Sequence, residues 1–355
     1  MVASVDLNRR QLPLPWLAEP LKAALGSARS HALLVQGPGG VGQFEMAMML
    51  AQTWLCEDPK REQDAWACGH CASCLLFDAH SHPDFKLLIP DALREPLGWA
   101  SDEAEGAARD GEVKAGKTKP SREIKVDAVR SAIGFAHQTS SRGRAKVVLV
   151  FPAEAVNLVA SNALLKTLEE PAGQLRFVLA SAAADALLPT IRSRCQPVPM
   201  ALPAEADCLS WLHAQGVDQP EVLLRGAGGR PQEALNWARD GIHSRTWALL
   251  PERVARGDAT ALSDWPVPRA IDALQRLCHD LLRRQCGAEP SYFPANVVPK
   301  VRLAQPLHGW AQALQEAARH AEHPLNASLL MESLLLQGQT ALAQANAAPS
   351  VHCTA

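Results

Sequence analysis

Short apolar runs alternate with longer amphipathic segments in the first part of the chain. The apolar runs predict buried β-strands, and apolar positions at helical spacing predict the helices between them. The predicted strands are residues 31–36, 84–89, 146–151, 175–180 and 196–200. The predicted helices are residues 42–56, a segment from Ile124 onward, and 153–170, which Pro171 ends. This alternation predicts an α/β fold, with a parallel sheet and helices on both of its faces.

The second part of the chain has a helical pattern. It begins at about residue 203, and the stretch 244–345 is rich in Leu and Ala at helical spacing. Residues 93–120 are rich in charge, Gly and Ala without periodicity, which indicates a surface insertion. We therefore expect three domains: an α/β domain at 1–202 with a variable loop at 93–120, a small helical domain at 203–243, and an all-α domain at 244–355.

A glycine-rich loop follows the first predicted strand. Residues 37–44 have the glycine spacing of the phosphate-binding Walker A loop, including Gly37 and Gly42, but its last two positions are Gln43 and Phe44. In an active loop, Lys neutralises the β- and γ-phosphates and Ser or Thr holds Mg²⁺. Backbone amides and the helix dipole remain for weak nucleotide docking. We expect no ATP turnover by this chain.

The residues after the third predicted strand also indicate that this chain does not hydrolyse ATP. In an active nucleotide hydrolase, acidic residues at the end of such a strand hold Mg²⁺ and orient water (the Walker B element). Here Pro152 follows the strand, and Glu154 is expected to lie past its end, at the start of a helix. A second metal-binding element is therefore degenerate.

Four of the nine cysteines form a cluster with the spacing C-x11-C-x2-C-x2-C. The members are Cys56, Cys68, Cys71 and Cys74. Thiolates two residues apart on a tight turn, here aided by Gly69, can bind one tetrahedral zinc ion. A site of four thiolates has no open position, so the cluster predicts a structural zinc insertion at 56–74. The remaining cysteines are expected to be reduced and buried, without a metal role: Cys195, Cys208, Cys278, Cys286 and Cys353.

Two histidines near the cluster leave the fourth ligand open. His70 or His80 could replace Cys56. Cys56 is preferred because it ends a predicted helix and would close the site over a long range.

Composition narrows the class of protein. The chain has 355 residues, 47% of them hydrophobic, and a net charge of −2, which argues against a free-standing polyanion binder. It has no signal pattern and no apolar run long enough to span a membrane, so we expect a soluble, cytoplasmic protein without a membrane partner. The basic residues Arg142, Arg144 and Lys146 are expected to form a solvated face, and no aromatic residues interleave with them to stack on single-stranded nucleic acid.

Several segments together resemble a known family. They are the degenerate loop, the cysteine insertion, His82-Pro-Asp84, Ser161-Asn-Ala-Leu-Leu-Lys-Thr-Leu-Glu-Glu-Pro171 and Leu188-Pro-Thr-Ile-Arg-Ser-Arg-Cys195. The chain resembles the delta-prime family of clamp-loader subunits of the bacterial DNA polymerase III, which are AAA+ proteins. The resemblance covers about residues 25–240 and reappears near the C-terminus at 323–334.

This resemblance implies a role for Ser193, Arg194 and Cys195. Similar subunits use an S-R-C motif as an arginine finger in trans, in which the Arg reaches the γ-phosphate of ATP on a neighbouring subunit. Arg194 precedes the last predicted strand and is expected near a sheet edge, whereas Arg192 is expected to be solvated or structural. In the lid, Gln232 stands where AAA+ proteins place a sensor arginine, which fits an unused nucleotide site.

The resemblance also implies the partners and the process. The chain would complete a heteropentamer with gamma/tau and delta subunits, through an AAA+ module, a helical lid and a helical collar. The assembled ring would load the sliding beta-clamp onto primer–template DNA during DNA replication. Two other classes stay open: an active ATPase of the gamma/tau type, and a zinc-dependent nucleic-acid-binding module without ring partners.

Overall fold

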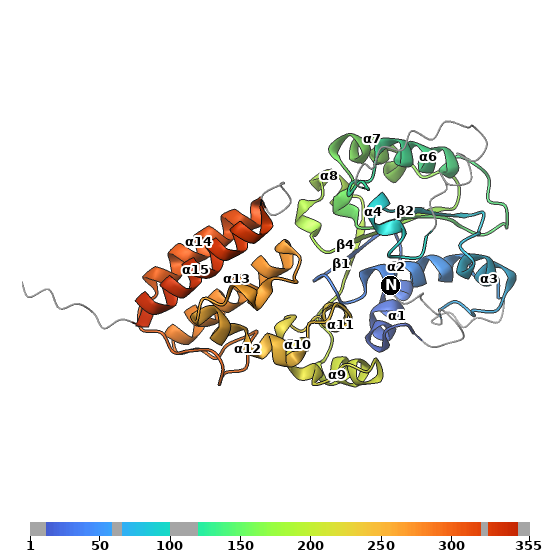
Figure 1. Cartoon of the computed structure of the whole chain (residues 1–355). Coiled ribbons are helices and arrows are strands. Elements are labelled where there is room, and N and C mark those ends of the chain that lie inside the picture. Colours follow the sequence, from blue (N-terminus) through green and yellow to red (C-terminus); the bar gives the residue numbers. More distant parts are fainter. Residues whose placement is uncertain (1–11, 59–65, 100–119, 321–325, 347–355) are drawn as a thin grey trace, which may run out of the picture. The chain divides into compact units, whose positions relative to one another are not determined.

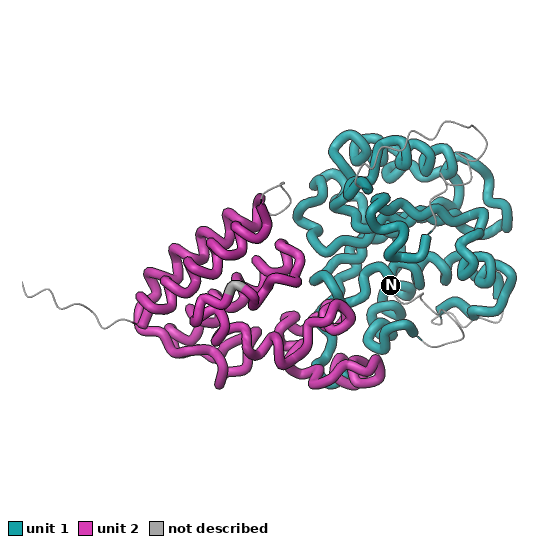
Figure 2. Tube along the Cα trace, viewed as in Figure 1, with its two compact units in different colours: residues 1–207 teal, residues 208–355 magenta. Residues whose placement is uncertain are grey.

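The computed structural model describes residues 12–58, 66–99, 120–320 and 326–346 (Figure 1). The chain divides into two compact units, residues 1–207 and residues 208–355 (Figure 2). Their boundary lies inside helix α9 (Glu205–Ala214), close to the predicted end of the α/β domain at residue 202. The predicted division of the helical part at residue 243 stays a prediction.

A five-stranded parallel sheet forms the centre of the first unit. Its strands are β1 (Ala32–Gln36), β2 (Phe85–Leu88), β3 (Lys146–Val150), β4 (Leu175–Ser181) and β5 (Gln196–Pro199). They pair in the order β2-β3-β4-β1-β5, all in parallel. Each of the five predicted strands is present, and the prediction of a parallel sheet is confirmed. β5 lies at one edge, so the residues just before it lie at that edge too.

Helices cover the two faces of this sheet (Figure 1). The helices of the unit are η1 (Pro15–Leu17), α1 (Ala18–Ser27), α2 (Gln43–Leu55), α3 (Ala72–Asp78), α4 (Asp91–Arg94), α6 (Val126–Ala136), η2 (Ala153–Ala155), α7 (Leu158–Glu169), η3 (Ala184–Ala186) and α8 (Pro189–Arg192). α2 packs against β3 and β4, whereas α6 and α7 pack together on the other face. Val148 and Val150 join the core beside α6 and α7, and β3 is buried throughout. Burial on both faces explains why the strand sequences are almost wholly apolar.

The helix predicted at residues 153–170 begins later than expected. Residues 153–155 form the short 3-10 helix η2, and α7 starts only at Leu158. Asn157 caps α7, because its side-chain oxygen accepts a hydrogen bond from the backbone N–H of Ala160 at 3.0 Å. An N-cap with this chemistry marks a helix start more strongly than apolar spacing does.

The insertion predicted at 93–120 is only partly described, since residues 100–119 lie outside the described residues. Its first residues complete α4 and lead to Trp99. The Trp99 ring stacks on His80, with ring centroids 3.9 Å apart. The beginning of the segment is therefore packed against the region between α3 and β2.

The second unit is helical. Its elements are α9 (Glu205–Ala214), α10 (Pro220–Gly226), α11 (Pro231–Arg239), α12 (Ser244–Ala255), η4 (Ala259–Leu262), α13 (Val267–Gln285), α14 (Gln305–Arg319) and α15 (Ala327–Asn346). Residues 286–304 connect α13 to α14 without helix, although almost continuous helix was predicted there. The segment is anchored to α13 because Asp280 accepts the backbone N–H groups of Ser291, Tyr292 and Phe293 at 2.8–2.9 Å.

One apolar core runs through the second unit, from α9 to α15. Trp247 is fully buried at its centre and stacks on Phe293, with ring centroids 4.5 Å apart. The buried Arg276 of α13 forms ion pairs with Glu233 of α11 and Asp272, at 3.0 and 2.7 Å. The predicted lid and collar segments therefore share side-chain contacts and a core. Among the described residues, no helix is long and apolar enough to cross a membrane.

Candidate functional site

The glycine loop connects β1 to α2, as predicted. Gly42 has a φ of 101°, a left-handed conformation that favours glycine, and a Cβ there would collide with Leu14. A Cβ on Gly37 would collide with the carbonyl oxygen of Met200. Both glycines are therefore required by the local backbone and its neighbours, whether or not a phosphate is bound.

The two residues that replace the Lys and Ser/Thr of an active loop are both packed inside the protein. Gln43 is 5% exposed, and its side-chain amide donates to the carbonyl oxygens of Gly37, at 2.9 Å, and Pro38. Phe44 is 6% exposed, and its ring lies against Phe151 with centroids 5.0 Å apart. A lysine would extend a charge toward phosphate, whereas Gln43 binds the loop itself.

The acidic side chain of Glu154 lies beside the carboxyl end of a neighbouring strand, β4. Glu154 was expected past the end of β3, at the start of a helix, and this is where it lies. It lies in η2, and its Oε1 accepts the backbone N–H of Ala182, just after β4, at 3.2 Å. Its Oε2 is buried without a hydrogen-bond partner. The packing of η2 against β4 and η3 places this carboxylate at the carboxyl end of the central strand.

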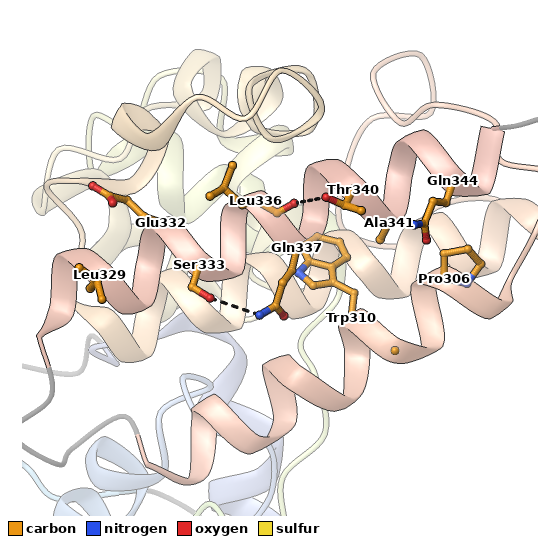
Figure 3. Close-up of a pocket in the computed structure, with 11 residues that line it drawn as sticks. Pro306, Trp310, Leu329, Glu332, Ser333, Leu336, Gln337, Thr340, Ala341 and Gln344 are labelled. Atoms are coloured by element: carbon orange, nitrogen blue, oxygen red, sulfur yellow. Dashed lines mark hydrogen bonds between the residues drawn. The ribbon is translucent and has the colours of Figure 1, made fainter.

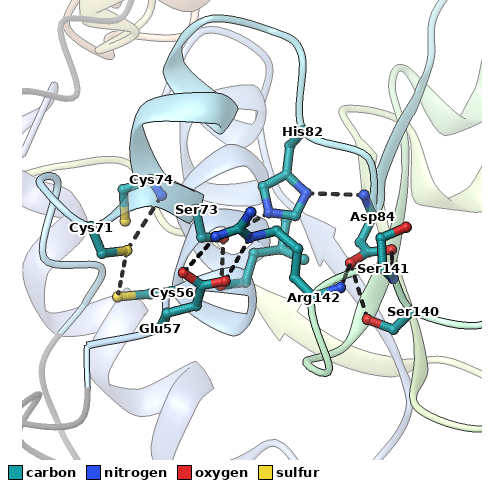
Figure 4. A network of polar contacts seen from close by, with 11 residues as sticks. Cys56, Glu57, Cys71, Ser73, Cys74, His82, Asp84, Ser140, Ser141 and Arg142 are labelled. Atoms are coloured by element: carbon teal, nitrogen blue, oxygen red, sulfur yellow. Dashed lines mark hydrogen bonds and ion pairs between the residues drawn. The ribbon is translucent and has the colours of Figure 1, made fainter.

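The four clustered cysteines lie together where α2 ends and α3 begins, and Figure 4 shows three of them, Cys56, Cys71 and Cys74. All four sulfurs lie within 4.8 Å of one another. Cys56 Sγ is 4.0 Å from Cys71 Sγ, and Cys68 Sγ is 3.9 Å from Cys74 Sγ. Zinc–sulfur bonds of about 2.3 Å at tetrahedral angles place sulfurs about 3.8 Å apart. The spacing of the sulfurs is therefore compatible with a closed tetrahedral zinc site.

The backbone around the cysteines points N–H groups at the sulfurs. Cys68 N–H donates to Cys56 Sγ at 3.5 Å, Cys71 N–H to Cys68 Sγ at 3.4 Å, and Cys74 N–H to Cys71 Sγ at 3.4 Å. Gly69 has a φ of 72°, the turn that its position predicted. Such donors stabilise negative charge on sulfur, as a metal-bound thiolate needs.

Hydrogen bonding also separates the acidities of two of these thiols. Hydrogen bonds, first with Cys74 and then from the backbone N–H of Cys68, outweigh the effect of burial and lower the pKa of Cys56 to about 4. The same side-chain bond, together with burial, raises the pKa of Cys74. Because metal ligands must be thiolates, an ion bound by these sulfurs would displace their protons.

Neither histidine that could have replaced Cys56 belongs to the group of four sulfurs. His70 is exposed, and its Nε2 lies 3.9 Å from an oxygen of Asp58. These two residues and Cys68 form a second, overlapping group of potential ligands. His80 instead stacks on Trp99, and burial lowers its pKa. The structure therefore groups Cys56 with the other three cysteines, as preferred from the sequence.

A polar network connects the cysteine group to the edge of the sheet (Figure 4). Glu57, next to Cys56, receives two hydrogen bonds from the Arg142 guanidinium at 2.6 and 3.0 Å. Ser73 donates to the carbonyl oxygen of Leu55 at 2.7 Å and lies 2.6 Å from His82 Nε2. Because His82 Nδ1 accepts the N–H of Asp84 at 3.0 Å, the proton of this ring is on Nε2.

Asp84 is the centre of the sheet end of this network. It is fully buried and accepts hydrogen bonds from Ser140 Oγ, Ser141 N–H and Arg142 N–H at 2.8–3.0 Å. The Lys146 ammonium lies 3.8 Å from Asp84 and 3.9 Å from the centroid of the Phe135 ring, and the Lys146 side chain is 6% exposed. Sequence reasoning described Arg142 and Lys146 as part of a solvated basic face. That prediction was wrong for Lys146, which is buried in an ion pair. Arg142 pairs with Glu57 but its side chain stays 29% exposed, and Arg144 is exposed as expected.

The S-R-C motif lies between α8 and β5, at the sheet edge expected from the sequence. Arg194 forms an ion pair with Glu169 at the end of α7, and its side chain remains 32% exposed. Cys195 is buried, and burial raises its pKa to about 12. Arg192 donates to Asp185 at 2.7 Å, in agreement with the structural or solvated role expected for it. Ser193 and Cys195 line a pocket of about 430 Å³ with Arg192.

Sequence reasoning missed the partners of these motif residues. Glu169 lies inside the family segment 161–171, and Glu57 adjoins Cys56, but no role was predicted for either residue. The sequence did contain one signal: each acidic residue stands next to a predicted metal ligand or at the end of a predicted helix. Position in the sequence alone does not identify the arginine that each carboxylate meets.

A groove lies between α14 and α15 in the second unit (Figure 3). Its volume is about 670 Å³, and its lining includes Pro306, Trp310 and Gln337. Leu329 and Leu336 also line it and are 67% and 57% exposed. Trp310 is buried, and its indole N–H donates to the carbonyl oxygen of Leu334 at 3.1 Å. The exposed leucines make this face a candidate assembly surface.

The glycine loop between a buried parallel strand and a helix defines a P-loop-type α/β protein. The family described as "DNA polymerase III, delta subunit" matches residues 17–203. The "DNA polymerase III subunit delta'" of Pseudomonas aeruginosa is 37% identical over 272 residues, 73% of this chain and 74% of that protein. The Escherichia coli protein of the same description is 32% identical over 288 residues, 77% of each. The chain therefore belongs to the DNA polymerase III delta' family.

Among solved structures, a DNA polymerase III gamma subunit-related protein from Thermotoga maritima matches with a TM-score of 0.46 and 16% sequence identity. The match covers 91% of this chain and 99% of that one.

Proposed function

We propose that this chain is a non-hydrolysing subunit of a clamp loader, which completes a ring and supplies an arginine finger to a neighbour. The proposal is supported by the contrast between the glycine loop and Arg194, the two features of the chain that relate to phosphate binding. Gln43 and Phe44 are packed within the loop and against Phe151, where an active loop would present Lys and a hydroxyl to nucleotide. Arg194 keeps an accessible guanidinium at the edge of the sheet.

The proposed chemistry occurs on the neighbouring subunit. Arg194 would contact the γ-phosphate of ATP bound there and stabilise the charge that develops as the phosphoryl group is transferred. Such a cation increases the rate by about 10³–10⁵. Arg suits this task because it stays protonated and presents several N–H donors in a planar fork. Ser193 and Cys195 would hold the motif in place and make no contact with nucleotide.

Zinc would have a structural role. Cys56, Cys68, Cys71 and Cys74 would hold the ion, and its charge would keep all four sulfurs deprotonated. The compact group, with N–H donors on three of the sulfurs, supports this assignment. Glu57 and Ser73 then connect the insertion to the sheet, so the ion would stabilise the α/β unit rather than take part in ATP chemistry.

The proposed assembly is a heteropentamer with gamma/tau and delta subunits. The chain would contribute an AAA+ module at 1–202, a lid at 203–243 and a collar at 244–355, with the groove between α14 and α15 as part of the collar contact. ATP turnover in the neighbours would drive the loading of the sliding beta-clamp onto primer–template DNA. No turnover is assigned to this chain, and its degenerate loop would bind nucleotide weakly or not at all.

The test compares a reconstituted loader containing the native chain with one containing Arg194→Ala. Clamp and primed DNA stimulate a pre-steady-state burst of ATP hydrolysis. We expect the amplitude of this burst to fall by the one ATP that is bound next to this chain. Hydrolysis at that site should slow by about 10³-fold or more. Arg192→Ala is the matched control, because Arg192 lies two residues away and pairs with Asp185. Size-exclusion chromatography verifies that each ring assembles.

Three outcomes would contradict the proposal. An unchanged burst with Arg194→Ala in an intact ring would leave the chain a scaffold without a finger. Robust ATP turnover by the purified chain alone would place it with the active ATPases. Salt-dependent DNA binding by the isolated chain, without association with loader subunits, would favour a nucleic-acid-binding module.

A further inference from the structure

The Arg194 side chain is held by two other elements of the first unit. Its Nε donates to Glu169 Oε1 at 2.7 Å, and its Nη2 donates to the same oxygen. Its Nη1 donates to the carbonyl oxygen of Thr190 at 2.8 Å and lies 3.4 Å from Ser193 Oγ. Glu169 is the last residue of α7, and Thr190 belongs to α8. The guanidinium plane is thus defined by contacts on two sides.

These contacts leave part of the guanidinium available. An arginine has five N–H donors, and the contacts described above account for one on Nε, one on Nη2 and the two on Nη1. Nε and Nη2 share one side of the fork, so Glu169 occupies that side. The second N–H of Nη2 points away from it, along the outer end of the side chain. A phosphate oxygen could be bound there without displacing Glu169.

The place of Glu169 in its helix is a second, independent observation. A carboxylate at the last residue of a helix lies beside the negative end of the helix dipole, which disfavours it. Helix stability therefore does not explain this residue. The Arg194 guanidinium forms an ion pair with this carboxylate and offsets its unfavourable charge.

We propose that Glu169 is a positioning residue for Arg194, fixing the guanidinium before the ring meets ATP. This inference rests on the proposed arginine finger and adds the residue that aims it. A flexible arginine would have to lose its rotamer freedom on reaching the transition state, whereas one held in place has lost it on folding. A carboxylate that competed with phosphate would bind the outer end of the guanidinium. Glu169 binds the side formed by Nε and Nη2 instead.

The experiment uses the reconstituted loader with four versions of this chain: Glu169→Ala, Glu169→Gln, Arg194→Ala and the double variant Glu169→Ala/Arg194→Ala. We expect Glu169→Ala to slow hydrolysis at the adjacent site by about tenfold to a hundredfold, with the KM for ATP unchanged. Glu169→Gln keeps an acceptor oxygen and should restore most of the rate. In the Arg194→Ala background, Glu169→Ala should have no further effect.

Glu170→Ala is the matched control, since this neighbouring carboxylate is also exposed. It should leave the rate unchanged, and all variants should retain the melting temperature and the assembly of the native ring. If Arg194→Ala slows hydrolysis but Glu169→Ala does not, or if the two effects multiply, the positioning role is refuted and the finger stands. If Arg194→Ala itself has no effect, the proposed function fails, and the positioning role fails with it.

Discussion

Replacing Asp84 by Asn tests the buried network that connects the cysteine group to the sheet. The substitution keeps the size of the side chain and removes its charge. Asn has one acceptor oxygen, so it cannot accept all three hydrogen bonds that Ser140, Ser141 and Arg142 now donate. The Lys146 ammonium, 6% exposed, would also lose its counter-ion.

The magnitude follows from burial. Removing one partner of a buried ion pair costs about 3–5 kcal/mol, because the remaining charge stays desolvated. For a unit of this size, each kcal/mol lowers the melting temperature by about 2–4 °C. We therefore expect Asp84→Asn to lower the melting temperature of the first unit by about 6–20 °C.

Calorimetry of the full chain and hydrogen exchange at β2 and β3 provide the measurement. The amides of these strands should lose protection, because the Val147 N–H donates to the carbonyl oxygen of Asp84 itself. Asp91→Asn is the matched control: Asp91 pairs with Lys125 at 2.9 Å, but the two side chains are 43% and 63% exposed. An exposed pair contributes at most about 1 kcal/mol. The reasoning would be refuted if Asp84→Asn and Asp91→Asn lowered the melting temperature by the same small amount.

The same substitution has an expected pH dependence. Burial by itself would raise the pKa of Asp84, but the hydrogen bonds from Ser141, Ser140 and Arg142 and the charge of Lys146 outweigh it, so the pKa is lowered. A carboxyl with a lowered folded pKa stabilises the fold above its unfolded pKa of about 3.9, and this stabilisation disappears as pH falls through the folded value. The deficit of Asp84→Asn should therefore be full at neutral pH and shrink below about pH 4.

Two further expectations concern the metal and the nucleotide. Native mass spectrometry should detect one zinc ion bound to the native chain and none bound to Cys71→Ser, which should also have a lower melting temperature. Cys286→Ser should change neither, because Cys286 lies outside the group and is exposed, not buried as expected. Retention of full zinc content by Cys71→Ser would argue against the four-sulfur site. Gln43→Lys with Phe44→Thr should strengthen ATP binding at least tenfold by calorimetric titration, since it restores the charge and hydroxyl that phosphate and Mg²⁺ require. An unchanged affinity would mean that other features, not these two residues, close the loop to nucleotide.

Local signals were sufficient for the strands, the glycine loop and the cysteine group. A strand buried on both faces must be apolar along its length, so β3 was recognisable before its neighbours were known. The cysteines lie close in sequence, and Gly69 supplies the turn between them. The start of α7 was missed because apolar spacing outweighed the N-cap signal of Asn157 in the prediction.

The sequence by itself determined the order of elements, the α/β character of the first unit, the loss of the Lys and Ser/Thr in the loop and the identity of the clustered thiols, because each depends on neighbouring positions. Only the tertiary structure decided which charges meet. Arg142 and Glu57 are 85 residues apart, and Arg194 and Glu169 are 25 apart. Such pairs arise where strand order and helix packing bring distant segments together, and no local periodicity encodes that distance. The same packing places Glu154 at the end of β4 and buries Lys146, which was predicted to lie at the surface.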